Sequence, residues 1–162
     1  VKRVLVPCAG CYRCFKRYYP ELIGAVDFEV VHIAELLAEL LPASGIKAQG
    51  NIEITYHDPC RLGRMEGIYQ QPRQAVRQCG VAVSEMAQNE EHAPCCGAGA
   101  AVRSVYRELS QKMAAEILTE IETDTLVTSC SFCLFNMTQT AKGEGSAKSV
   151  AYIAQIVLDS LT

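Results

Sequence analysis

The sequence lacks the features that mark several large classes of protein. It has no run of basic residues and a formal net charge of −3, which argues against nucleic acid as its principal partner. Its longest apolar stretches, at 33–41 and 153–161, are interrupted by charged or amide side chains and are too short to cross a membrane. No signal peptide is recognisable at the start. We therefore expect a cytoplasmic chain without a membrane span, which leaves peripheral association with a membrane open.

A nucleotide-binding fingerprint is missing as well. Gly97-Ala98-Gly99 is the nearest match, and it lacks the rest of the dinucleotide pattern. Flavin or nicotinamide chemistry is therefore expected on another subunit and not on this chain.

Cysteine is the residue that the sequence has in excess. There are nine cysteines in 162 residues, at positions 8, 11, 14, 60, 79, 95, 96, 130 and 133. A chain of this length can build a hydrophobic core without a disulfide framework, and an odd count fits such a framework poorly. The cysteines therefore predict metal or redox chemistry in a reducing compartment.

The adjacent pair Cys95-Cys96 is the strongest local signal. Neighbouring side chains on a helix or strand point in different directions, so two adjacent cysteines do not both fill one core. They suit an inorganic group large enough to bridge them. Glycines follow the pair and a helical pattern comes next. We expect the pair at a helix N-terminus, where the dipole favours thiolate over thiol.

Short apolar runs alternate with helical patterns along the chain. The runs at 3–7, 28–31, 52–56, 81–86 and 125–128 predict strands. The stretches at 32–41, 72–79, 102–121 and 150–161 predict helices, and 12–22 predicts a helix that Pro20 disturbs. This order indicates an α/β fold of repeated βαβ units, with helices flanking a parallel sheet. Apart from the pair, the cysteine motifs follow the carboxyl ends of strands, where open α/β sheets place their sites.

The chain also repeats itself. Residues 4–11 parallel residues 126–133, and residues 32–37 parallel residues 152–157. Only the second copy has a further cysteine strand and the Cys95-Cys96 pair in front of it. We therefore expect 1–45 to be the back half of a first repeat and 46–162 to be a complete second repeat. The apolar faces of the half repeat would need cover, which predicts packing on the second repeat, a homodimer or a strand exchange.

The cysteines of the second repeat resemble those of the CCG-domain family. The motifs that carry the resemblance are His57-Asp58-Pro59-Cys60, Pro94-Cys95-Cys96-Gly97 and Cys130-x-x-Cys133. This family includes one of the subunits of heterodisulfide reductase and the iron–sulfur subunits of glycolate and lactate oxidation systems. Full members carry two such motifs. Here the second is complete, and the first keeps only Cys8 and Cys11.

The resemblance implies an iron–sulfur electron-transfer subunit of an oxidoreductase that is not active alone. Its cofactor would be a 4Fe–4S cluster, of the non-cubane kind in the heterodisulfide reductase branch. Its partners would be subunits that carry flavin or iron–sulfur centres. The implied ligands of the cluster are Cys60, Cys95, Cys96, Cys130 and Cys133. Arg61, Arg64 and Arg103 lie near these residues in sequence and would offset the negative charge of the cluster.

Two other functions stay open. Four thiolates would also satisfy tetrahedral zinc in a structural domain, although five ligands are one too many. An aerobic sample would be empty or loaded with zinc even if the native cofactor is iron–sulfur. The second alternative is a thiol–disulfide oxidoreductase that uses one Cys-x-x-Cys pair.

The remaining cysteines and histidines have simpler interpretations. Cys79 lies on a helical pattern and is expected in the core, while Cys14 is as suited to packing as to ligation. Cys8 and Cys11 form half of a site, and alone they would equally suit a reversible disulfide. His57 is expected to fix its loop and not to act directly.

Overall fold

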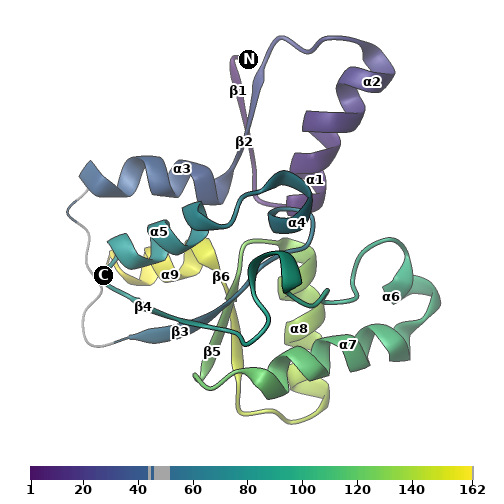
Figure 1. Ribbon diagram of the computed structural model, residues 1–162, viewed down its shortest axis with the longest axis vertical. Helices are drawn as coiled ribbons and strands as arrows, with labels where there is room; N and C mark the ends of the chain where they lie inside the picture. The colour runs from purple at the N-terminus through teal and green to yellow at the C-terminus, as the bar shows by residue number, and fades with distance from the viewer. Residues whose placement is uncertain (44, 46–51, 162) are drawn as a thin grey trace.

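The computed structural model describes residues 1–43, 45 and 52–161, and it contains two parallel sheets (Figure 1). The larger sheet has the order β4-β3-β5-β6, and the smaller pairs β1 with β2. The bounds of the strands are β1 (Arg3–Val6), β2 (Glu29–His32), β3 (Glu53–His57), β4 (Ala82–Glu85), β5 (Thr125–Thr128) and β6 (Ser149–Tyr152). Every strand pair is parallel. The predicted α/β class with parallel pairing is therefore confirmed.

Helices cover both faces of the larger sheet (Figure 1). On one face lie α3 (Ile33–Leu40), α5 (Gln70–Gln78) and α9 (Ile153–Asp159), and on the other lie α7 (Arg107–Glu120) and α8 (Ser131–Gly143). Successive residues of a strand point to opposite faces. Leu126 and Val127 accordingly enter two different cores, Leu126 with residues of α7 and α8, and Val127 with residues of α3, α5 and α9. The sheet is thus covered on both sides, which explains why the adjacent residues Leu126 and Val127 in the middle of β5 are both apolar.

The segment between β1 and β2 is a continuous helical stretch. It consists of α1 (Ala9–Arg13), a π-helical turn (Cys14–Tyr18) and α2 (Tyr19–Ile23). Pro20 lies in the first turn of α2, where its missing N–H costs little. The expectation that Pro20 disturbs this helix is therefore wrong, because the π-turn places it at the start of a new helical segment.

Two of the expected helices differ in the structure. The stretch 150–161 is not one helix: residues Ser149–Tyr152 form strand β6 beside β5, and only then does α9 begin. Periodicity does not separate a short buried strand from a helix, and pairing with β5 decides the outcome here. The stretch 102–121 is two helices, α6 (Val102–Val105) and α7, with a break at Tyr106. Shorter helical segments complete the chain: α4 (Gly63–Glu66) and the 3₁₀ turns Leu41–Ala43 and Glu90–His92.

The two copies of the repeat fold alike. Val6 of β1 is in register with His32 of β2, and Thr128 of β5 is in register with Tyr152 of β6. In both copies a cysteine follows with extended backbone and precedes a helix. Cys8 has φ −119° and ψ 123°, and Cys130 has φ −132° and ψ 124°.

The two copies also differ in their neighbours. In the larger sheet β5 lies between β3 and β6, whereas within the described residues β1 pairs only with β2. The predicted boundary between the two repeats lies at 45–46, and residues 46–51 lie outside the described ranges. The division into a half repeat and a complete repeat therefore stays a prediction.

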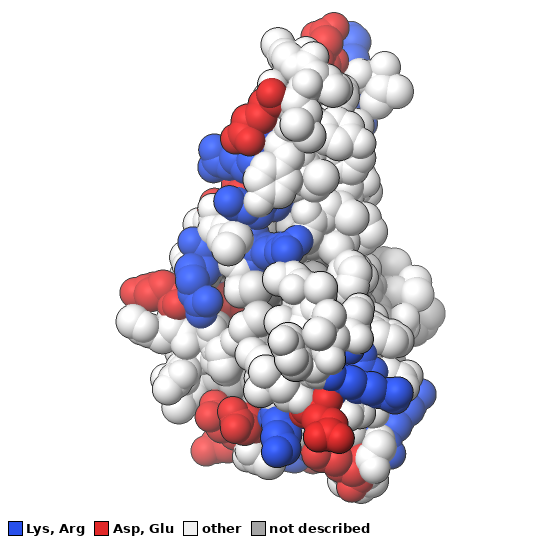
Figure 2. Space-filling model, turned by 90° about the vertical axis from the view of Figure 1, so that its right-hand side faces the viewer, with Lys and Arg blue, Asp and Glu red and all other residues white. Residues whose placement is uncertain are grey.

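The surface carries both signs of charge. On the face shown in Figure 2, basic and acidic side chains are interspersed around a broad uncharged area. Within the described residues, every helix is too short or too polar to cross a membrane.

Candidate functional site

All five cysteines of the complete motif line one cavity. Its volume is about 300 Å³, and its walls include Cys60, Cys95, Cys96, Cys130 and Cys133. Cys60 follows β3, Cys130 and Cys133 follow β5, and the adjacent pair lies in the loop after β4. The predicted convergence of these segments is therefore present in the structure. Whether the five thiols are ligands stays a prediction.

The sulfur atoms lie close to one another in pairs. Sγ of Cys60 is 3.8 Å from Sγ of Cys95, and Sγ of Cys96 is 3.0 Å from Sγ of Cys133. All nine cysteines are free thiols. Among the described residues, no three His, Cys, Asp or Glu side chains are gathered closely enough to hold a single metal ion. The thiols are instead spread around the wall of the cavity.

Cys130 lies where a helix favours negative charge. It precedes α8, and the N–H groups of Phe132 and Cys133 point at its sulfur. The pKa of Cys130 falls to about 2, first because the thiol of Cys133 donates to its sulfur, and then because Cys8 and these N–H groups do so. Cys130 is therefore the thiolate at this end of the cavity.

Cys95 is a second favoured thiolate, but its position differs from the prediction. The pair lies in a loop several residues before the short helix α6, and the long helix α7 begins only at Arg107. The expected placement at a helix N-terminus is therefore wrong. The pKa of Cys95 nevertheless falls to about 2, because the thiols of Cys60 and Cys96 donate to its sulfur and the N–H of Gly97 adds a further bond.

Gly97 makes the sharp turn behind the pair possible. Its φ is +76°, and a Cβ there would lie 3.0 Å from Cα of Ser110 and 3.1 Å from Sδ of Met113. Ala100 and Ala101 also have positive φ, 52° and 64°. The chain therefore turns sharply along the wall of the cavity before α6 begins, which is why the helical pattern does not reach back to the cysteines.

His57 fastens the loop of the pair to strand β3. Its Nε2 is 3.0 Å from the carbonyl oxygen of Pro94, the residue before Cys95, and its Nδ1 is 3.5 Å from Oγ1 of Thr128. Burial lowers the pKa of His57, so the ring is neutral and Nε2–H donates to Pro94. The expectation that His57 fixes a loop agrees with this geometry, although the loop is that of the pair.

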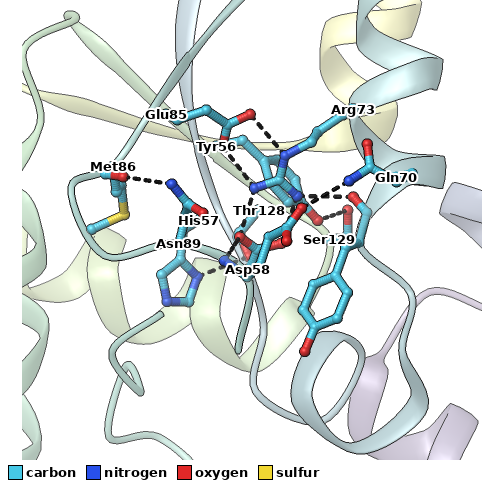
Figure 3. Close-up of polar contacts among 12 residues, drawn as sticks. Tyr56, His57, Asp58, Gln70, Arg73, Glu85, Met86, Asn89, Thr128 and Ser129 are labelled. Carbon is cyan, nitrogen blue, oxygen red and sulfur yellow. Dashed lines mark hydrogen bonds and ion pairs between the residues drawn. The ribbon is translucent and has the colours of Figure 1, made fainter. Parts of the chain in front are cut away.

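A buried ion network supports the turn between β3 and Cys60 (Figure 3). The guanidinium of Arg73 lies 2.7 Å from both carboxylate oxygens of Asp58 and 2.7 Å from Oε2 of Glu85. Asp58 also accepts the N–H of Glu90 at 2.9 Å. Arg73 and Asp58 are both buried. Helix α5 is thereby tied to the β3 turn and to the segment before the pair.

Asn136 fastens the pair from the other side. Its Nδ2 donates to the carbonyl oxygen of Cys96 and to Oγ of Ser110, the latter at 3.0 Å. Its Oδ1 accepts from Arg103. Sequence reasoning missed Asn136 and Arg73, because their partners lie far away in the sequence. The one available signal was that a polar residue interrupts the apolar pattern of α8.

The three arginines near the cysteines have different roles. Arg61 lines the cavity. Arg64 instead donates to the carbonyl oxygens of Glu91 and Ala93 and so holds the chain before Pro94. Arg103 donates to Asn136. Of the three arginines expected to offset the charge of a cluster, Arg61 alone is among the described residues that line the cavity.

The other four cysteines lie outside the walls of this cavity. Cys79 is fully buried in the core with α3, α5 and α9, as predicted. Cys14 is half-buried and Cys11 is exposed. Cys8 is buried, and its thiol donates to the sulfur of Cys130, which raises the pKa of Cys8. The half motif therefore touches the complete one through Cys8.

The chain is similar to known proteins over most of its length. It matches the CCG family, described as a cysteine-rich domain, over residues 54–138, a range that includes all five cavity cysteines. One subunit of the dihydromethanophenazine:CoB–CoM heterodisulfide reductase of Methanosarcina barkeri is 38% identical over 96% of this chain and 39% of its own length. One subunit of the fumarate reductase (CoM/CoB) of Methanothermobacter marburgensis is 31% identical over 88% of this chain and 29% of its own length.

A third relative comes from a different system. The EtfAB:quinone oxidoreductase of Syntrophomonas wolfei is 34% identical over 83% of this chain and 20% of its own length. All three relatives are oxidoreductases or subunits of them. The chain spans about two fifths or less of the length of each.

Proposed function

Because this chain belongs to the CCG cysteine-rich domain family, we propose that it is the iron–sulfur electron-transfer part of an oxidoreductase of the heterodisulfide-reductase type. The observation that carries the proposal is the set of five cysteines, drawn from three separate segments of the chain, around one cavity of about 300 Å³. We propose that these five hold a 4Fe–4S cluster, of the non-cubane kind where all five bind.

The donor set fits such a cluster. Thiolates are the usual protein ligands of iron–sulfur centres, and two cavity cysteines, Cys95 and Cys130, have a pKa lowered to about 2. Cys96, Cys130 and Cys133 are buried, while Cys60 and Cys95 are half-buried. Two of the five thiols thus favour the thiolate form, while hydrogen bonding among the sulfur atoms and burial raise the pKa of Cys60, Cys96 and Cys133. All five are partly or wholly buried, and they are distributed around a volume instead of a point. A bound cluster supplies one-electron transfer.

Other residues of the chain hold the cysteine-bearing segments in place. His57 and Asn136 hold the main chain on either side of the adjacent pair through the carbonyl oxygens of Pro94 and Cys96. The Asp58–Arg73 pair holds the turn that delivers Cys60. Preformed geometry of this kind limits the movement of the ligands when the charge of the centre changes.

We propose that the partners are redox subunits or domains carrying flavin or iron–sulfur centres. The support is that the relatives are subunits or larger proteins of which this chain spans only a part. We propose further that 1–45 is the back half of a first CCG repeat and 46–162 the complete second, because β1–β2 and β5–β6 fold alike. Electrons would then enter or leave on the side of Cys8, where the two copies meet.

The test is anaerobic reconstitution of the purified chain with iron and sulfide. We expect visible absorbance and about four irons per chain. The Cys95→Ser and Cys96→Ser variants should lose most of the iron, and Cys60→Ser, Cys130→Ser and Cys133→Ser should lose or alter the centre. Cys79→Ser is the matched control, since Cys79 lies in the core away from the cavity.

Four outcomes would overturn the proposal. Failure of the wild-type chain to take up iron is the first, and equal iron loss in the Cys95→Ser and Cys79→Ser variants is the second. Colourless protein that binds zinc tightly in competition with iron would favour the structural zinc domain. Disulfide reductase activity of the metal-free chain that depends on Cys130 and Cys133, but not on the other cavity cysteines, would favour the dithiol enzyme.

A further inference from the structure

Among the residues that the structure describes, Arg61 is the one cation that lines the cysteine cavity. It follows Cys60 directly in the turn after β3. Its guanidinium lies between two glycines from distant parts of the chain. A Cβ at Gly10 would lie 3.2 Å from Nη1 of Arg61, and a Cβ at Gly99 would lie 3.9 Å from Nη2. The guanidinium therefore occupies space that a side chain at position 10 would contest, whereas a Cβ at position 99 would make ordinary van der Waals contact.

The arginines near the cavity differ in whether another group of the protein neutralises or binds their guanidinium. Arg64 and Arg103 are hydrogen-bonded to carbonyl or amide oxygens, and Arg13 and Arg73 are paired with carboxylates. Within the described ranges, Arg61 has no ion pair and no hydrogen bond to another side chain. The other residues that line the cavity are cysteines and small or apolar residues with Ser104. An uncompensated cation therefore faces a group of thiols.

The consequence of this juxtaposition is electrostatic. A centre held by several thiolates carries net negative charge, and reduction adds one more electron. A cation in a partly enclosed cavity is screened less than one in bulk water, so it stabilises the more negative state. Charge and solvent exposure are among the factors that set the potentials of iron–sulfur centres.

We infer that Arg61 is a positioning residue that raises the reduction potential of the centre held by the five cysteines, and that Gly10 sets the place of its guanidinium. This inference rests on the proposed function. It also gives the N-terminal segment a part in the site, because Gly10 lies in α1 while Arg61 lies beside the first cysteine of the complete motif. The small size of Gly10 leaves room for the cation at the cavity wall.

The test is a potentiometric titration of reconstituted wild-type protein and four variants at one ionic strength. For Arg61→Gln we expect the reduction equilibrium to shift at least tenfold toward the oxidised form, which is 59 mV for one electron. Arg61→Lys should retain most of the wild-type potential, because it keeps the charge. Gly10→Ala should shift the potential in the same direction as Arg61→Gln, although it leaves the charge unchanged. Arg77→Gln is the control, since Arg77 is half exposed on α5 beside Glu85.

The outcomes separate the inference from the proposed function. If the wild-type chain takes up no iron, the proposed function fails. If it takes up iron and Arg61→Gln has the wild-type potential, or Arg77→Gln shifts it as much, only the role of Arg61 is refuted. If Arg61→Gln binds no cluster, the other two variants test the role of Arg61. A wild-type reduction potential in Gly10→Ala would refute that role. So would a fall in the reduction potential of Arg61→Lys as large as the fall expected for Arg61→Gln.

Discussion

Nε2 of His57 lies 3.0 Å from the carbonyl oxygen of Pro94, so the end of strand β3 holds the loop that carries the adjacent cysteine pair. The contact joins two of the three cysteine motifs, His57-Asp58-Pro59-Cys60 and Pro94-Cys95-Cys96-Gly97, through a neutral, buried imidazole. The first motif thus supplies both the thiol of Cys60 and the imidazole that holds the loop of Cys95 and Cys96.

Replacing His57 by Ala should loosen this loop. The buried carbonyl of Pro94 would lose its donor and a cavity would form, so we expect the free energy of unfolding to fall by about 2–3 kcal/mol. Iron should also leave the reconstituted protein faster. Urea unfolding and the rate of iron loss to a chelator measure the two effects. His92→Ala is the control, because His92 is 78% exposed, and equal effects in both variants would contradict the role of His57.

His32 should make folding sensitive to acid. Burial lowers the pKa of His32 to about 4, below its ordinary value near 6.5, so the unfolded chain binds more protons between these two pH values. The stabilisation is complete above about pH 6.5 and is lost as the pH falls toward 4, by about 3 kcal/mol in total. Protonation would also remove the acceptor at Nδ1 that caps α3 through the N–H of Ala34.

The measurement compares wild type with His32→Gln in urea at several pH values, both metal-free and reduced. Other titrating groups are common to the two proteins and cancel in the difference. We expect the difference in the free energy of unfolding between them to shrink as the pH falls. A difference that is constant from pH 7 to pH 4 would show that His32 does not carry the effect.

Gly97→Ala should cost more than the same change at Gly67. Both glycines have positive φ, +76° and +72°, but only at Gly97 would a Cβ meet other atoms. We expect about 1–2 kcal/mol of backbone strain in either variant and a further 1–3 kcal/mol of overpacking at Gly97. Denaturant unfolding of the two variants measures both losses in the free energy of unfolding, provided that its dependence on denaturant concentration keeps the wild-type slope. Equal losses would mean that Ser110 and Met113 move aside freely.

Arg73→Gln should be among the most damaging single substitutions in the chain. It would leave the buried carboxylate of Asp58 without its partner, which costs about 3–5 kcal/mol. The control Arg3→Gln removes exposed pairs with Glu29 and Glu39, which solvent and salt screen, so we expect little change in stability. Thermal unfolding of both variants tests the contrast. A small loss at Arg73 would show that Asp58 is reached by water or is protonated.

The sequence allowed the parallel α/β fold and the meeting of the cysteines to be predicted, because both depend on local order along the chain. A strand end followed by Cys60 or Cys130 can be recognised from a few residues, and parallel strands bring their carboxyl ends together. Strand β6 was missed since Ser149–Tyr152 runs straight into a helix, and the two patterns merge. The strand at 28–31 occupies the same place in the first copy, so the repeat itself contained the missing information.

The geometry behind the pair was beyond local reasoning. The positive φ values of Ala100 and Ala101 turn the chain before α6, and no rule of composition assigns such values to alanine. The same holds for Asn136 and Arg73, whose partners are set by the packing of α8 and α5 on the sheet. Which of the three nearby arginines lines the cavity was equally undetermined, because Arg61, Arg64 and Arg103 all lie close to a cysteine in the sequence and their hydrogen-bond partners are set by the fold.

The close approach of Arg61 to Gly10 has a consequence for how the chain can change over time. A side chain at position 10 would compete with the guanidinium for the same volume, so neither position is free to vary alone. Substitutions there should be correlated, as they are for residues in contact. Homologous chains with a larger residue at position 10 should carry a side chain shorter than arginine at position 61.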